Sequence, residues 1–194
     1  MELRRRDLDA DPLRQFERWW ADASSVQDVP ERMAVATADA DGSPSLRMVL
    51  LKSFDERGLV FFTHYTSRKG RELGGNPRAA LLLYWDRLGR QVRVEGSVGR
   101  VSPDESDAYF ATRPAAARVG AAVSRQSEVL ESRAELDARV AEVAGESVER
   151  PSTWGGFRVI ADAWEFWQHR DDRLHDRFRY TRAGDDWISE RLYP

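Results

Sequence analysis

The stretch from Met33 to Tyr65, "MAVATADADGSPSLRMVLLKSFDERGLVFFTHY", decides the fold class. It contains three short runs rich in strand-forming residues. Asp41-Gly42 and the cluster from Asp55 to Gly58 separate these runs, and both are ordinary turn signals. Strand-forming runs joined by short turns indicate strands that pair with their neighbours in the sequence. The stretch therefore predicts a meander of antiparallel strands.

Further strands are predicted on the C-terminal side of this stretch. "AALLLYW" and "RQVRVEGSVGRVS" are joined by a turn from Asp86 to Gly89, and "WGGFRVIADAWEFWQ", "RLHDRFRYTR" and "WISERLYP" close the chain. Many short strands with helices in their connections are typical of a small barrel. The predicted fold class is α+β, mainly β: a small β-barrel with peripheral helices.

Four helices are predicted from periodicity and capping signals. One follows Asp11-Pro12, one covers "SRKGREL" from Ser67, one begins at Ser102 and ends before Pro114, and one spans roughly Ser127–Val143. The third start is the clearest, because Ser102 can cap it, Pro103 suits its first position and Glu105 completes a capping box. Tyr109 and Arg113 are four residues apart, which predicts that they share one face of this helix.

Composition limits the class of protein and its partners. The chain has 194 residues, 41% of them hydrophobic and 32% charged, which predicts a single globular domain over residues 1–194. A net charge of −3 with interspersed basic residues provides no field that would attract nucleic acid or an anionic membrane. The sequence has no cysteine, which excludes disulfides, zinc–thiolate sites and thiol nucleophiles.

Location and metal binding are predicted from what the sequence lacks. No apolar run is long enough to span a bilayer, and the start "MELRRRDLDADPL" has no apolar core of a secretory signal. We therefore expect a cytoplasmic protein. His64, His169 and His175 have no metal-ligand spacing with acidic residues, so no metal site is predicted.

The stretch "SRKGREL" places Arg68 and Lys69 in the first turn of a helix, where the helix dipole is already positive. Two interpretations remain open. Backbone N–H groups, the dipole and both side chains could share one phosphate. A solvated surface turn is the simpler interpretation, and these seven residues alone favour it.

The stretch "RMVLLK" places one cation on each face of a strand. Alternation puts Arg47, Val49 and Leu51 on one face, and Met48, Leu50 and Lys52 on the other. A buried cation is costly unless it reaches water, an acid or a bound anion. Solvated strand ends are the safer interpretation of these six residues alone.

Two C-terminal patterns carry groups that could bind a ligand. "RLHDR" predicts Arg173, His175 and Arg177 on one strand face, where they could hold a carboxylate or phosphate and offer an imidazole. "SRQS" supplies the amide of Gln126 and the hydroxyl of Ser127, although Ser127 could equally cap a helix. Each pattern is weak on its own.

Taken in order, eight stretches resemble the pyridoxine/pyridoxamine 5′-phosphate oxidase family across nearly the whole chain. They are "RRRDLDADPL", "RMVLLK", "FFTHYTSRKGREL", "RQVRVEG", "YFATRP", "SRQS", "WEFWQ" and "RLHDRFRY". The resemblance implies an FMN-binding split β-barrel and a homodimer that binds two FMN molecules at its interface. It also implies that residues 1–25 form an N-terminal arm and helix, and that the strands of residues 151–194 form part of the dimer and the active site.

The resemblance assigns cofactor-binding roles to many of the residues named above. The implied FMN-binding residues are Arg47, Met48, Val49, Leu50, Leu51, Lys52, Phe62, Thr63, Ser67, Arg68, Lys69, Gln91, Gln126, Ser127, Trp167 and Arg177. Among them Arg47, Arg68 and Lys69 would hold the flavin phosphate, which supplies the anion for the unusual helix start. Trp167 and Arg177 would come from the partner subunit or its edge.

The resemblance also implies a substrate and a reaction. Lys52, Tyr109 and Arg113 would hold the phosphate of a phosphorylated pyridine, and Arg173 and His175 would lie over its ring as the catalytic pair. A hydride would pass from the C4′ carbon to the flavin, and O2 would then be reduced to H2O2. The protein's task would be positioning and electrostatics, because the flavin supplies the redox chemistry.

The sequence departs from the family pattern at several places. Ala117 stands where the family has a phosphate-binding serine, Ala122 stands where a tryptophan is usual, and "WQHRDDRLHDR" replaces a Gly-rich turn. An Arg-rich lid that precedes the helix in the family is missing. Two other functions therefore remain open: oxidation of another aromatic substrate, as in phenazine biosynthesis, and non-enzymatic binding of flavin or pyridoxal phosphate.

Overall fold

The computed structural model describes residues 2–143, 145 and 147–194. In this part of the chain one sheet is built from the strands β1 (Arg32–Ala38), β2 (Pro44–Leu50), β3 (Ser53–Asp55), β4 (Gly58–His64), β5 (Arg78–Trp85), β6 (Arg90–Arg100), β7 (Trp154–Gln168), β8 (Asp176–Ala183) and β9 (Asp186–Leu192). The helices are α1 (Pro12–Val26), α2 (Arg68–Gly75), α3 (Pro103–Thr112), α4 (Ala115–Val123) and α5 (Arg133–Glu142). Every paired strand is antiparallel, and the predicted fold class is confirmed.

The order of the strands corrects the predicted meander. Neighbours in the sheet follow the order β2-β1-β5-β6-β7-β4-β3, so β1 and β2 form one hairpin and β3 and β4 form another. The two hairpins lie at opposite ends of this path, although Lys52 links them by donating its N–H to the carbonyl of Val60 at 2.8 Å. Turn signals predicted the strands correctly, but they carry no information on long-range pairing.

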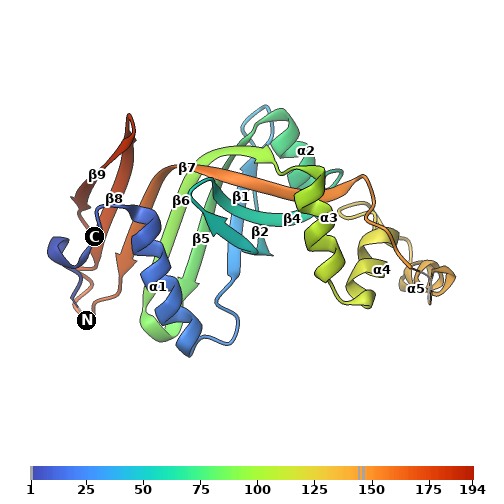
Figure 1. The fold of residues 1–194 in the computed structure, drawn as a ribbon, viewed down its shortest axis with the longest axis horizontal. Helices are drawn as coiled ribbons and strands as arrows, with labels where there is room; N and C mark the ends of the chain where they lie inside the picture. The colour runs from blue at the N-terminus through green and yellow to red at the C-terminus, as the bar shows by residue number, and fades with distance from the viewer. Residues whose placement is uncertain (1, 144, 146) are drawn as a thin grey trace.

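Strand β7 connects the β3–β4 hairpin to the rest of the sheet, and it runs along the molecule from beside α3 to beside β8 (Figure 1). Its first residues pair with β4 and its last residues pair with β8, while β6 pairs along most of its length. The register shifts between Glu95 and Gly96 of β6, which pair with Ala163 and Ala161, so the extra residue Asp162 forms a bulge in β7. A Cβ at Gly96 would lie 1.9 Å from the carbonyl oxygen of Ile160, so this close approach requires glycine.

Helix α1 closes one side of the curled sheet and forms the centre of the core. Asp11 caps it by accepting the N–H of Leu13 at 2.9 Å, and Pro12 occupies its first turn, as the sequence predicted. Phe16 packs against Trp164 with ring centroids 5.4 Å apart, and Trp19 packs edge-on against Phe166 at 5.2 Å. The N-terminal helix is thereby fixed to β7.

The outward face of β2 and β5 carries large apolar side chains that the described chain leaves exposed. Leu46 is 70% exposed, Met48 62% and Tyr84 57%, while the neighbours of Tyr84 on the other face of β5 are buried and those of Leu46 and Met48 on β2 are partly buried. Soluble monomers rarely expose such side chains on one sheet face, and apolar faces of this kind mark contact surfaces.

The helices after Pro114 differ from the prediction in two ways. Helix α3 ends at Thr112, before Pro114, as predicted, but Pro114 is followed directly by α4, a helix that was not predicted. The helix expected from Ser127 begins instead at Arg133, because Ser132 caps it by accepting the N–H of Glu135 at 3.2 Å. Ser127 lies in a turn with φ of 75°, a left-handed conformation that a helix N-cap does not adopt.

None of the helices in the described ranges has both the length and the apolar character needed to cross a membrane. The same residues contain no group of three or more histidine, cysteine or acidic side chains arranged to hold a metal ion.

Candidate functional site

A cleft of about 650 Å³ lies among β2, β4, the start of α2, α3 and α4. Its lining includes the sequence-predicted residues Met48, Val49, Leu50, Lys52, Phe62, Thr63, Lys69, Tyr109, Arg113 and Gln126. Clefts of this size are typical of cofactor and small-molecule sites. The structure therefore brings together residues that are up to 78 positions apart, from Met48 to Gln126.

Lys69 lies in the wall of this cleft with only 7% of its surface exposed. Its ammonium donates hydrogen bonds to Thr63 Oγ1 and Gln126 Oε1, both at 3.0 Å. Burial, followed by the charge of Arg47, lowers the pKa of Lys69 to about 8, against a small opposing effect of Glu72. A buried ammonium surrounded by neutral acceptors and a second cation is electrostatically suited to an anion.

Helix α2 begins at Arg68, as predicted, and Ser67 caps it. The Ser67 hydroxyl accepts the N–H of Gly70 at 3.3 Å and donates to the carbonyl of His64 at 2.7 Å. Arg68, the next residue, directs Nε to Glu72 at 2.8 Å, and Arg47 of β2 approaches the same carboxylate at 3.3 Å. The two predicted phosphate-binding arginines thus meet beside Lys69.

The predicted alternation along "RMVLLK" is confirmed. Met48 and Leu50 face outward, whereas Arg47 and Val49 are partly buried on the opposite face. Leu51 is 3% exposed and packs in the main core, so its side chain faces away from the cleft. Only the main chain of Leu51 could therefore contact a flavin, and this contact stays a prediction.

Aromatic rings form one wall of the cleft, and the cation Arg113 lies against one of them. Phe62 stacks on Tyr109 with centroids 4.0 Å apart and on Trp154 at 5.3 Å. Arg113 caps the end of α3, and its guanidinium lies 4.7 Å from the centroid of Trp154. Within the described chain, Arg113 Nη1 is buried without a hydrogen-bond partner. Tyr109 and Arg113 are brought together as expected.

Several cleft residues were not identified from the sequence. His64 lines the cleft and is buried, and burial together with the charges of Lys69 and Arg113 lowers its pKa, so the ring is neutral at pH 7. Trp154 also lines the cleft. Its position at the start of a strand was visible in the sequence, but its contact with α3 depends on long-range packing.

A second group of predicted residues lies at the other end of β7. Gln91 pairs with Trp167 across β6 and β7, and Trp167 pairs with Arg177 across β7 and β8. His175 packs against Trp167 with ring centroids 4.6 Å apart. Arg177 donates from Nε to the buried carboxylate of Glu165 at 2.9 Å.

The predicted strand geometry of "RLHDR" is wrong. Strand β8 begins only at Asp176, and Arg173 has a left-handed φ of 67° in the preceding turn. Alternation therefore does not apply to Arg173 and His175, whose positions are set by the turn. Within this turn His175 Nδ1 accepts the N–H of Arg170 at 3.1 Å, so a neutral ring carries its proton on Nε2.

The two groups of predicted residues do not meet within one chain. Trp154 of the cleft and Trp167 of the second group both belong to β7, thirteen positions apart. A strand of that length measures about 43 Å along its contour. In Figure 1 the two ends of β7 lie on opposite sides of the molecule.

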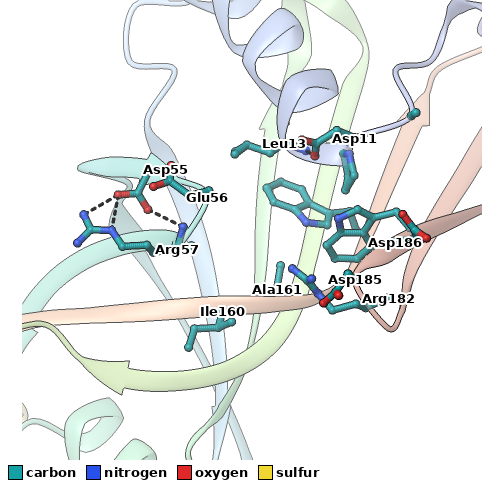
Figure 2. A pocket seen from close by; sticks show the side chains of 15 residues that line it. Asp11, Leu13, Asp55, Glu56, Arg57, Ile160, Ala161, Arg182, Asp185 and Asp186 are labelled. Atoms are coloured by element: carbon teal, nitrogen blue, oxygen red, sulfur yellow. Dashed lines mark hydrogen bonds and ion pairs between the residues drawn. The ribbon is translucent and has the colours of Figure 1, made fainter.

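Another cleft, of about 420 Å³, lies between the start of α1, the β3–β4 turn, β7 and the β8–β9 hairpin (Figure 2). Its lining contains none of the predicted site residues. Its charged side chains are engaged locally: Asp55 accepts from Arg57 and from Arg158, and Arg182 lies 4.7 Å over the ring of Trp187. These contacts mark the cleft as a junction between elements.

The sheet topology and the cationic cleft define a class: this is a split-barrel protein of the kind that binds flavins. A family model described as "Pyridoxamine 5′-phosphate oxidase" matches residues 26–146, and one described as "Pyridoxine 5′-phosphate oxidase C-terminal dimerisation region" matches residues 154–194. The chain belongs to the pyridoxamine 5′-phosphate oxidase family and is an oxidoreductase of this FMN-dependent type. The resemblance seen in the sequence is thereby confirmed.

Curated relatives support this assignment over nearly the whole chain. A protein of Paraburkholderia phymatum named pyridoxine/pyridoxamine 5′-phosphate oxidase is 55% identical over 193 residues, covering 97% of this chain and 91% of its own. A protein of the same name from Rubrobacter xylanophilus is 55% identical and covers 96% of this chain and 88% of its own.

Solved structures share the fold. PhzG from Burkholderia lata, solved with tetrahydrophenazine-1-carboxylic acid, superposes with a TM-score of 0.94 at 36% identity, covering 100% of this chain and 98% of its own. A pyridoxamine 5′-phosphate oxidase-related, FMN-binding protein from Nostoc punctiforme has a TM-score of 0.76 at 18% identity, covering 96% of this chain and 100% of its own. The second likeness concerns the fold alone.

Proposed function

We propose that this chain is an FMN-dependent oxidase that converts pyridoxine 5′-phosphate or pyridoxamine 5′-phosphate to pyridoxal 5′-phosphate. The electron acceptor is O2 and the reduced product is H2O2. The active form is a homodimer with two sites.

One observation carries this proposal: three cations, Lys52, Lys69 and Arg113, line a single cleft, and Arg47 lies near Lys69 outside the lining. We assign Lys69 and Arg47 to one phosphate as the first cation group, and Arg113 and Lys52 to another phosphate as the second cation group. An FMN-dependent oxidase of a phosphorylated pyridine must hold two phosphates, one on the cofactor and one on the substrate. A flavin enzyme with an uncharged substrate would need only the first group.

The residues of the cleft fit FMN. The lowered pKa of the buried Lys69 reflects burial and a neighbouring cation, and a phosphate at this position would relieve both costs. Met48 and Leu50 offer an apolar surface beside it, and Gln126 holds its carbonyl oxygen on the lysine, leaving its amide nitrogen for ligand acceptors. We propose the remaining implied contacts of Ser127, Gln91, Trp167 and Arg177 on the family pattern.

The substrate phosphate fits the second cation group. Arg113 and Tyr109 line the same cleft, and Arg113 is held in place by its contact with Trp154. Ala117 lines the cleft as well, so the serine hydroxyl of the family pattern is replaced by a methyl group. We expect this loss to cost roughly 1 kcal/mol of binding free energy.

The chemistry of the reaction is divided between cofactor and protein. FMN supplies the two-electron step: a hydride from C4′ and a proton from the attached group leave the substrate, and two electrons and two protons finally reduce O2 to H2O2. The amine substrate also consumes one water and releases ammonia. Through its Nε2–H, His175 orients the substrate ring and the group at C4′, and Arg173 covers the ring beside it.

The homodimer explains why the predicted residues fall into two groups. One chain places Arg113 and Lys69 at one end of β7, and His175, Trp167 and Arg177 at the other end. A two-fold axis can bring the first group of one subunit to the second group of its partner. The exposed apolar face around Leu46, Met48 and Tyr84 offers a surface for this contact.

A second candidate function follows from the likeness to PhzG. Its TM-score of 0.94 and 36% identity favour a flavin oxidase that acts on a tetrahydrophenazine carboxylic acid. The two functions differ in what Arg113 and Lys52 must bind. Oxidation of pyridoxine 5′-phosphate but not of unphosphorylated pyridoxine would support the first function.

The test is a steady-state assay of the purified, FMN-loaded protein. H2O2 release is measured with pyridoxine 5′-phosphate, pyridoxamine 5′-phosphate, pyridoxine and a tetrahydrophenazine carboxylic acid. We expect turnover with the two phosphorylated substrates. Turnover with the phenazine precursor alone would establish the second function instead.

A further inference from the structure

One buried carboxylate lies behind the proposed flavin-phosphate site. Glu72 of α2 is 6% exposed and accepts hydrogen bonds from four side chains. Thr37 Oγ1 and Ser45 Oγ each lie 2.5 Å from Oε2, and Arg47 Nη2 lies 3.3 Å from the same oxygen. Arg68 Nε lies 2.8 Å from Oε1.

The fold explains how these groups converge. Thr37 and Ser45 are directly opposite each other in the β1–β2 hairpin, so their hydroxyls form one pair at its end. Arg47 follows Ser45 on the same strand face and bonds to both hydroxyls. Arg68 and Glu72 are four residues apart on α2. The carboxylate therefore joins the helix start to the hairpin.

The arrangement leaves most of the Arg68 guanidinium available, whereas both terminal nitrogens of Arg47 donate to protein acceptors. Within the described chain, Arg68 contacts the carboxylate through Nε, and 58% of its side chain remains exposed. Both arginines are held by one fixed acceptor, which removes rotamer freedom before any ligand arrives. Such preorganisation increases the affinity for an anion with several acceptor oxygens, such as a phosphate.

The charges also balance when a phosphate is added. Arg47, Arg68 and Lys69 contribute three positive charges and Glu72 contributes one negative charge. Burial raises the pKa of Glu72, but the hydrogen bonds from Ser45, Thr37 and Arg68 and the charge of Arg47 outweigh this and lower it to about 2. The carboxyl group is thus ionised at neutral pH. A phosphate of roughly two negative charges would bring the sum close to zero.

We propose that Glu72 is a positioning residue for the flavin phosphate, which acts by holding Arg47 and Arg68 in their binding geometry. This inference rests on the proposed binding of FMN at the start of α2. Glu72 itself does not contact the cofactor. If the carboxylate merely competed with the phosphate for the arginines, its removal would strengthen FMN binding, so the sign of the effect decides between the two roles.

The experiment compares FMN with riboflavin, which has the same ring system but no phosphate. Dissociation constants of both are measured by flavin fluorescence for the apoprotein and for Glu72→Gln. We expect the variant to bind FMN about 10-fold or more weakly, the loss typical of a charge-assisted contact, while riboflavin binding changes by less than about 2-fold. The circular dichroism spectrum serves as the control for folding.

The outcomes separate the inference from the function on which it rests. Equal losses for FMN and riboflavin would reduce Glu72 to a general structural role, and unchanged or tighter FMN binding would show competition; either result overturns the inference. A wild-type protein that binds neither flavin would instead overturn the proposed function.

A second variant covers the case in which Glu72→Gln does not fold. Thr37→Val removes one hydroxyl that holds the carboxylate and keeps the side-chain shape and all charges. We expect a smaller loss that is again specific to FMN. A loss that affects riboflavin equally would contradict the positioning role.

Discussion

Lys69 Nζ lies 3.0 Å from Oε1 of Gln126, so the start of α2 is joined to the loop that follows α4. This contact connects residues 57 positions apart and closes one wall of the proposed flavin site. It also holds a buried ammonium beside Arg47 without a carboxylate in direct contact among the described residues. The first predictions concern this lysine.

Replacing Lys69 by alanine is expected to weaken FMN binding by about 10-fold or more, because the variant loses a charge-assisted phosphate contact. Arg47→Ala should have a similar effect. The measurement is the FMN dissociation constant by fluorescence titration. Arg71→Ala on the exposed side of the same helix is the control and should bind FMN normally. Full flavin occupancy in both site variants would mean that the phosphate binds elsewhere.

FMN affinity is expected to fall as the pH rises above about 8. The Lys69 ammonium, which faces Arg47, Glu72, Thr63 and Gln126, has its pKa lowered to about 8 and loses its proton in that range, whereas binding of a phosphate favours the protonated form. Titrations from pH 7 to pH 10 measure this, and Lys69→Arg should bind without the decline. A flat profile for the wild-type protein would contradict the role of Lys69.

The stability of the apoprotein should show the opposite trend over the same range. Because the pKa of Lys69 is lower in the folded chain than the ordinary lysine value of 10.5, the unfolded chain binds more protons between about pH 8 and pH 10.5. The contribution of this group to the free energy of unfolding therefore rises with pH in that window. Urea unfolding of the wild-type protein and of Lys69→Met at several pH values isolates this contribution. Between about pH 8 and pH 10.5 the free energy of unfolding of the wild-type protein should rise relative to that of Lys69→Met.

Arg113→Ala is expected to raise the KM for pyridoxine 5′-phosphate by about 10- to 100-fold and to leave FMN occupancy unchanged, because Arg113 belongs to the second cation group. Steady-state kinetics and the flavin absorbance of the purified variant give both values. Arg113→Lys should recover part of the loss. An equal loss of flavin would place Arg113 in the cofactor half of the site.

Arg158→Met should lower the free energy of unfolding by about 1–2 kcal/mol, because two partly exposed carboxylates each lose one of their partners. Arg158 donates to Asp55 at 2.9 Å and to Glu105 at 2.7 Å, and so connects the β3–β4 hairpin to the start of α3. Urea unfolding measures the change. Arg57→Met, on the exposed side of the same Asp55 carboxylate, is the matched control and should change stability less.

Subunit complementation tests the composite site. Arg113→Ala and His175→Ala should each form dimers that retain FMN and have little activity at a substrate concentration far below the raised KM of Arg113→Ala, because they remove groups from opposite ends of β7. After the two variants are mixed and their subunits exchanged, half of the dimers contain one intact site, and activity should recover to about a quarter of the wild-type value. Recovery no greater than the sum of the parents, with exchange verified, would show that each site lies within one chain.

Local signals predicted much of the fold correctly. The capping box of Ser102 and Glu105 involves residues three positions apart, so the sequence contains all the atoms that form it. Helix α4, which begins directly after Pro114, was not predicted, because no side-chain cap marks its start. Arg173 was misplaced on a strand, since a left-handed turn residue cannot be recognised from alternation.

The candidate site was predictable only where a family pattern added to the residues themselves. Glu72 and His64 were missed because their roles depend on contacts with β1, β2 and α3, which no local spacing reveals. Arg68 and Lys69 stand in the first turn of α2, where the helix dipole disfavours a positive charge. Their unfavourable positions in the helix are offset by Glu72 and by neutral acceptors.

The most direct test of the proposed oxidase is an anaerobic half-reaction. The purified protein is loaded with FMN, oxygen is removed, pyridoxine 5′-phosphate is added, and the visible absorbance of the flavin is followed. We expect the absorbance to bleach and to return when air is admitted. A bound flavin that stays oxidised with both pyridoxine 5′-phosphate and pyridoxamine 5′-phosphate would contradict the proposed function.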